Sequence, residues 1–204
     1  KTSVLNALSG LIPEKDRILV LEDASELQLQ QKHCVYFETR KPDKNGQGEF
    51  SIRDLLIASL RLRPDRLVIG EIRGAEALQA MNTGHSGSMS TIHANSPVDA
   101  LSRMETCAIM SGVNLPLNAI RMQVASAVDC VIHTMRLPDG SRKVVEIAEI
   151  LPLENGEYRL SPLMQWKTES VAPDGSVSGR FILGVPPTFR YHAEVMHLEL
   201  PSYA

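Results

Sequence analysis

The stretch Leu67-Val68-Ile69-Gly70-Glu71 places three apolar residues in a row and closes them with a glycine and an acid. A short continuous apolar run of this kind is typical of a central strand in a parallel sheet, which is covered on both faces. Residues 17–21 form a second such run, and the acidic cluster 22–26 follows it directly. Ligands of parallel α/β sheets bind beyond the carboxyl ends of the strands. The two runs therefore predict a buried parallel sheet with acids at its ligand-binding edge.

Helix and strand patterns alternate along the first part of the chain. Further strand patterns occupy 35–40 and 89–92, and helical patterns begin at Lys1, at the capping box 51–54 and after Gly74. Alternation at these lengths predicts the α/β fold class with a parallel sheet.

The second half of the chain changes character after residue 96. Two helix patterns and then two strand patterns follow one another, at 97–110, 116–128, 131–137 and 143–150. Beyond Leu151 the sequence is irregular and polar. We therefore expect a core over residues 1–150, with a helical insertion at about 97–128, and a small irregular C-terminal appendage over 151–204.

The first residues, Lys1-Thr2-Ser3, precede an amphipathic helix pattern and match the end of a phosphate-binding loop, G-x-x-x-x-G-K-[ST]. In such a loop the lysine neutralises the outer phosphates, the hydroxyl ligates magnesium, and the helix N-terminus attracts the anion. The glycines of the pattern would lie before Lys1, so we expect the chain to begin inside the loop and to bind ATP weakly on its own. Taken alone, Lys-Thr before a helix is a common sequence, and the rest of the chain must support this interpretation.

Composition narrows the class of protein. The chain has 204 residues, a net charge of −3 and 4% aromatic residues, which disfavours direct binding of nucleic acid. Apolar runs are too short to cross a bilayer, so no membrane insertion is expected. The three cysteines are widely spaced, as in a reducing, cytoplasmic compartment.

Four stretches, in this order, together resemble one family: Lys1-Thr2; Leu21-Glu22-Asp23-Ala24-Ser25-Glu26-Leu27; 60–74, LRLRPDRLVIGEIRG; and 83–95, TGHSGSMSTIHAN. They are similar to the Walker A, Asp box, Walker B and His box of the hexameric type II and type IV secretion ATPases, a family that includes type IV pilus and conjugation motors. The tail, at 174–181 and 187–189, most resembles the CpaF-like branch that assembles Flp (Tad) pili.

The resemblance implies a RecA-like P-loop NTPase core that uses ATP and Mg²⁺. It also implies a homo-hexameric ring in the cytoplasm, docked at the inner membrane on the platform proteins of a pilus or secretion machine. Lys1, Thr2 and Ser3 would bind the nucleotide.

The acids of the two boxes are the candidates for water and metal chemistry. Glu71 follows a glycine at a strand end, where it can hold magnesium, directly or through water, or polarise the attacking water. Glu22 and Asp23 are neighbours and point to opposite faces while strand geometry lasts, so we favour Glu22 as the residue that positions water. Glu26 is a second candidate if a turn brings it back. Which acid is the formal base stays open.

Histidines and arginines complete the candidate site. His93 ends a predicted strand and can sense the γ-phosphate by hydrogen bonding, and His85 lies in the glycine-rich turn. A ring ATPase also needs an arginine near the γ-phosphate, often one donated to a neighbouring subunit. Arg61 and Arg73 are the preferred candidates, ahead of Arg63 and Arg40.

The functional expectation is ATP hydrolysis by a ring-forming motor that powers Flp (Tad) pilus assembly or type II/IV secretion. Two alternatives remain: a conjugative DNA-transfer ATPase of the same fold, and a ring component that binds nucleotide without hydrolysing it. The presence of Lys1, Thr2, Glu22 and Glu71 argues against the non-catalytic alternative.

Overall fold

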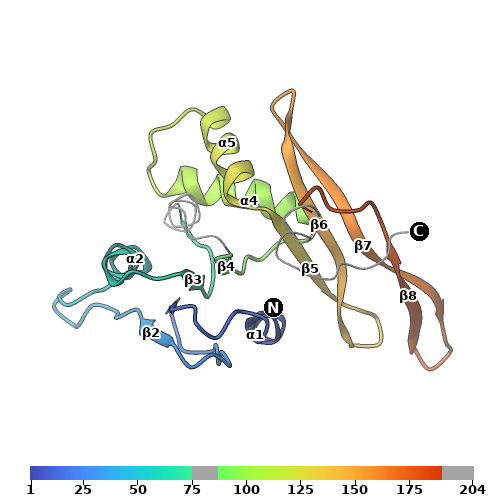
Figure 1. Cartoon of the computed structure of the whole chain (residues 1–204), viewed down its shortest axis with the longest axis horizontal. Helices are drawn as coiled ribbons and strands as arrows, with labels where there is room; N and C mark the ends of the chain where they lie inside the picture. The colour runs from blue at the N-terminus through green and yellow to red at the C-terminus, as the bar shows by residue number, and fades with distance from the viewer. Residues whose placement is uncertain (75–86, 190–204) are drawn as a thin grey trace. The chain divides into compact units, whose positions relative to one another are not determined.

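The computed structural model describes residues 1–74 and 87–189, which form two compact units (Figure 1). The first unit comprises Lys1–Ala94 and Ser102–Ala127, and the second comprises Asn95–Leu101 and Val128–Ala204. The helix that we predicted after Gly74, together with His85, lies outside the described residues.

The first unit contains a four-stranded parallel sheet with the strand order β2-β1-β3-β4. Its strands are β1 (Ile18–Glu22), β2 (Cys34–Glu38), β3 (Arg66–Ile69) and β4 (Met89–Ser90). Leu19 of β1 lies opposite Leu67 of β3, and every residue of β1 is buried. The α/β fold with a parallel sheet is therefore confirmed, and β1 lies in its interior because both of its faces are apolar.

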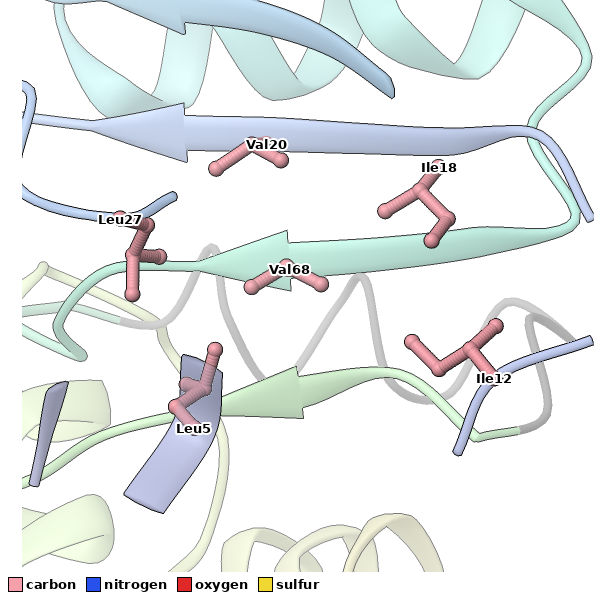
Figure 2. Close-up of a cluster of buried hydrophobic side chains, with 6 residues drawn as sticks. All are labelled: Leu5, Ile12, Ile18, Val20, Leu27 and Val68. Carbon is pink, nitrogen blue, oxygen red and sulfur yellow. The ribbon is translucent and has the colours of Figure 1, made fainter. Parts of the chain in front are cut away.

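The core beside this sheet is drawn in Figure 2. Ile18 and Val20 of β1 and Val68 of β3 form one buried cluster with side chains from the segments that flank β1. Those flanking members are Leu5 of α1 (Thr2–Ser9), Ile12 and Leu27. Burial of Leu5 fixes α1 against the sheet, and burial of Leu27 fixes the end of the acidic box.

A helix and a short 3-10 helix link β2 to β3. The capping box predicted at the start of α2 (Ile52–Ser59) is present, because the Ser51 hydroxyl accepts from the Asp54 N–H while the Asp54 carboxylate accepts from Ser51. The 3-10 helix η1 (Leu60–Leu62) continues from α2 and ends at Arg63, whose φ of 52° is left-handed. The chain then enters β3 at its amino end.

The predicted helical segment consists of α4 (Pro97–Met110) and α5 (Leu117–Ala127). Ser96 accepts a hydrogen bond from the Asp99 N–H and so caps the start of α4. Glu105 of α4 and Arg121 of α5 form an ion pair of 2.9 Å between largely buried side chains, which joins the two helices.

The second unit contains an antiparallel sheet with the order β5-β6-β7-β8. Its strands are β5 (Cys130–Arg136), β6 (Arg142–Glu154), β7 (Glu157–Val171) and β8 (Val177–Leu183). The boundary that we predicted at residue 150 thus falls inside β6, and the predicted irregular appendage contains the regular strands β7 and β8. Leu163 is the one buried residue of β7 and β8, so these strands need no continuous apolar run and their sequence reads as polar and irregular.

The turn after β8 depends on Gly184. The Gly184 N–H donates to Leu163, the Val185 N–H donates to Pro162, and a Cβ at position 184 would collide with the Pro162 carbonyl oxygen. Four residues after Gly184, the backbone N–H and the hydroxyl of Thr188 donate to the buried Glu149 carboxylate.

We expect Gly184→Ala to lower the free energy of unfolding of the second unit by about 1–3 kcal/mol, because backbone must move to admit the methyl group. Gly10→Ala is the matched control, since Gly10 has an ordinary helical φ of −60° and its nearest neighbour is a movable Gln30 side chain. Chemical denaturation of both variants measures the difference. Equal stabilities would show that the turn does not need a glycine.

Candidate functional site

Lys1 and Thr2 lie at the start of α1, beside the carboxyl edge of the parallel sheet. Lys1 is the N-cap residue, and its carbonyl accepts the first helical hydrogen bond, from the Leu5 N–H. Partial burial lowers the pKa of the Lys1 ammonium; the Arg103 charge acts in the same direction, whereas the carboxylates of Glu71 and Glu26 raise it. The amine is therefore close to acids from both predicted acidic boxes.

Glu22 is the buried anchor of the acidic loop that follows β1. Its side chain is 4% exposed, and its Oε1 accepts from the N–H groups of Glu26 and Leu27, at 3.1 and 3.0 Å. Gly70 leaves room for this side chain, because a Cβ there would lie 3.1 Å from Glu22 Cγ and would push it aside. Glu22 Oε1 thus shapes the loop, and the water-positioning role that we expect of Glu22 stays a prediction.

The loop brings Glu26 back to the start of α1. Its Oε2 lies 3.5 Å from the Thr2 hydroxyl oxygen. A turn that brings Glu26 back toward the helix is thus present. Glu22 stabilises this turn, because its Oε1 accepts from the Glu26 N–H.

Glu71 follows β3 and shares a cluster of charges with Arg73 and Asp23. Arg73 donates to Glu71 Oε2 from Nε, at 3.1 Å, and from Nη2, at 3.0 Å. Its Nη1 lies 2.7 Å from Asp23 Oδ2. Hydrogen bonding to Glu71 raises the pKa of Arg73, and the Asp23 charge adds to that effect.

The outer strands extend this cluster along the edge of the sheet. His93, after β4, has its Nε2 3.5 Å from Glu71 Oε1. Thr39, directly after β2, has its hydroxyl 3.3 Å from Asp23 Oδ1. The sequence did not single out Thr39, because the strand pattern over 35–40 places it inside a strand, whereas β2 ends at Glu38.

Two of the predicted residues take no part in this cluster. Arg61 is exposed in η1, which precedes the amino end of β3, whereas the acids lie beyond the carboxyl ends. Ser3 is exposed on the first turn of α1. His85 lies outside the described residues.

Within the described ranges, no group of three or more His, Cys, Asp or Glu side chains is arranged to hold a metal ion. Mg²⁺ keeps several waters and binds through one or two protein ligands plus phosphate oxygens. The Thr2 hydroxyl and the Glu71 carboxylate therefore fit magnesium that arrives with a nucleotide, not a metal held by protein alone. Among the helices of the described residues, none has the length and apolarity to cross a membrane.

A parallel sheet with a Lys-Thr helix start and acids at its carboxyl edge is the arrangement of RecA-like α/β domains, whose ligands bind at that edge. The chain belongs to the type II/IV secretion system protein family, which it matches over residues 1–169. This confirms the family that the four sequence boxes indicated.

Individual relatives agree with this assignment. A putative conjugal transfer protein of Mycobacterium tuberculosis is 36% identical over 181 residues, which are 87% of this chain and 50% of that protein. The type IV secretion system protein PtlH of Bordetella pertussis is 39% identical over 156 residues, 72% of this chain and 46% of that protein.

Among solved structures, the VirB11 ATPase of the Brucella suis type IV secretion system superposes with a TM-score of 0.61 and 28% identity, covering 72% of this chain and 44% of that one. The chain spans about half the length of the curated relatives it matches.

We expect Glu22→Ala to reduce the free energy of unfolding by about 1–3 kcal/mol, because it leaves two backbone N–H groups without their acceptor. The amides of Glu26 and Leu27 should then exchange hydrogen faster, as measured by NMR or mass spectrometry. Glu38→Ala is the matched control: Glu38 pairs with Glu22 across β1 and β2 but is exposed. Unchanged exchange at both amides in Glu22→Ala would remove the anchoring role.

Proposed function

We propose that this chain is the catalytic region of a Mg²⁺-dependent ATPase whose ring assembly powers type II/IV secretion or pilus assembly. The observation that carries the proposal is the Lys-Thr start of α1, where Glu26 lies 3.5 Å from the Thr2 hydroxyl and the Glu71 charge raises the pKa of Lys1, within a member of the secretion family.

Phosphoryl transfer to water needs charge neutralisation and an oriented nucleophile more than covalent catalysis. The Lys1 ammonium and the N–H groups at the start of α1 would neutralise the phosphates. Glu71 would orient the attacking water from beyond β3, and Glu26 would orient the Thr2 hydroxyl. His93, 3.5 Å from Glu71, would sense the γ-phosphate and link its presence to the position of that acid.

Magnesium fits this set of residues as the partner of a nucleotide. The Thr2 hydroxyl and Glu71, directly or through water, would hold it. Bound Mg²⁺ would supply charge stabilisation at the phosphate oxygens.

A homo-hexameric ring is part of the proposal because Arg61 lies away from the acids of its own chain. Exposed apolar side chains surround it on α2 and η1: Ile57 is 52% exposed, Leu60 38% and Leu62 39%. Apolar residues around an exposed arginine suit a contact between subunits. Arg61 would then serve the nucleotide of a neighbouring subunit.

We place the ring in the cytoplasm, peripheral to the inner membrane, with the platform proteins of a pilus or secretion machine as partners. The tail supports the Flp (Tad) branch through its resemblance at 174–181 and 187–189. A second candidate, conjugative DNA transfer, is favoured by the M. tuberculosis relative, which is named as a putative conjugal transfer protein. Because the net charge is −3, the chain would then power DNA transfer without binding DNA directly.

Deleting the gene in its own host distinguishes pilus assembly, protein secretion and conjugative DNA transfer. Loss of pili, of a secreted protein or of plasmid transfer, each restored by the wild-type gene, would assign the machine that the ATPase serves. Plasmid transfer as the sole loss would overturn the pilus assignment.

We expect Glu71→Gln in the complete protein to bind ATP but to lose turnover by at least about 100-fold, because the amide no longer polarises water. Phosphate release measures turnover, and isothermal titration measures binding. Glu169→Gln is the control, since Glu169 also pairs with an arginine, Arg180, but lies in the second unit. Parental turnover in Glu71→Gln would refute the role of Glu71.

A further inference from the structure

A chain of polar contacts crosses the carboxyl ends of all four described strands of the parallel sheet. It follows the strand order: Thr39 after β2, Asp23 after β1, Arg73 and Glu71 after β3, and His93 after β4. Asp23 and Arg73 are the links that join β1 to β3.

Arg73 directs two of its nitrogens at Glu71 and one at Asp23. Nε and Nη2 both reach Glu71 Oε2, and Nη1 reaches Asp23 Oδ2. This arrangement holds one oxygen of Glu71 and leaves Oε1 directed toward His93. The guanidinium is planar, so fixing Nη1 on Asp23 also fixes the direction of Nε and Nη2.

Asp23 is itself held in place. The Thr39 hydroxyl lies 3.3 Å from both Asp23 Oδ1 and the Asp23 carbonyl oxygen. The Thr39 N–H donates to the backbone carbonyl of Glu22. The carboxylate therefore has a defined position before any ligand binds.

Fold stability does not account for the Asp23–Arg73 pair. The side chain of Arg73 is 66% exposed and that of Asp23 is 35% exposed. Ion pairs with this exposure contribute little to folding, whereas their geometry can still direct a neighbouring group.

We propose that Asp23 is a positioning residue, which acts through Arg73 to hold Glu71 Oε2 and to leave Glu71 Oε1 for the attacking water. This inference rests on the proposed ATPase function. It also assigns Arg73 to the site of its own chain and not to that of a neighbouring subunit.

The test is the steady-state kinetics of Asp23→Asn and Asp23→Glu in the complete protein. Misplacement of a catalytic group by about 1 Å can cost about 100-fold in rate, so we expect Asp23→Asn to lower kcat by about 10- to 100-fold. KM for ATP should change less than about twofold, because Asp23 contacts the group that directs water and not the Lys1 end of the site. Asp23→Glu keeps the charge and should recover part of the lost kcat.

Asp16→Asn is the matched control. Asp16 forms the same kind of pair with Arg66, at 2.6 Å, but at the amino ends of the strands. A purely structural role for acid–arginine pairs would make the two Asn variants alike in kcat. A kcat for Asp23→Asn within about twofold of the parent, or an equal loss in Asp16→Asn, would overturn the proposal.

A second readout is independent of ATP. The ¹⁵Nε–H signal of Arg73, identified by its loss in Arg73→Lys, should show a restrained guanidinium in the wild type and a freely rotating one in Asp23→Asn. A freely rotating Arg73 in the wild type would overturn the positioning role whatever the kinetics. If the wild-type protein does not hydrolyse ATP, the proposed function fails, and this signal alone decides whether Asp23 holds Arg73.

Discussion

The in-register parallel pairing of β1 with β3 is the constraint on which the ligand-binding edge depends. Leu21 lies opposite Ile69, so the chain leaves both strands at the same level and sets Glu22 beside Gly70. Both strands are buried on both faces, and a slip of one residue would exchange the faces of every side chain. The same pairing therefore fixes the core and brings the acids of two distant boxes together.

The sequence predicted this edge well and its internal arrangement poorly. Apolar runs that end in acids identified the strands, and their parallel pairing brought Glu71, Asp23 and Lys1 together as expected. Strand alternation, however, cannot predict how the loop turns once the strand ends. The two N–H groups that bind Glu22 and the burial of Leu27 decide that turn, and neither leaves a local pattern in the sequence.

The part of the second unit after residue 150 was misjudged for a related reason, whereas the strands predicted at 131–137 and 143–150 are present as β5 and β6. β7 is a strand of 15 residues, yet much of it is exposed, so it has no continuous apolar run. Its stabilising contacts come from pairing with β6 and β8, and from Trp166, which packs edge-on against Phe181 and under the Lys143 ammonium. Contacts between paired strands cannot be predicted from the periodicity within any one of them.

The loop after β1 holds three acids in three different environments. Glu22 is buried and bound to backbone, so moving it would expose unpaired N–H groups. Asp23 is partly exposed and is held by Arg73 and by the Thr39 hydroxyl. Glu26 returns to the start of α1, where its Oε2 lies 3.5 Å from the Thr2 hydroxyl oxygen. Glu22 therefore fixes the loop to its own backbone, so that Asp23 faces the neighbouring strand end and Glu26 faces the start of α1.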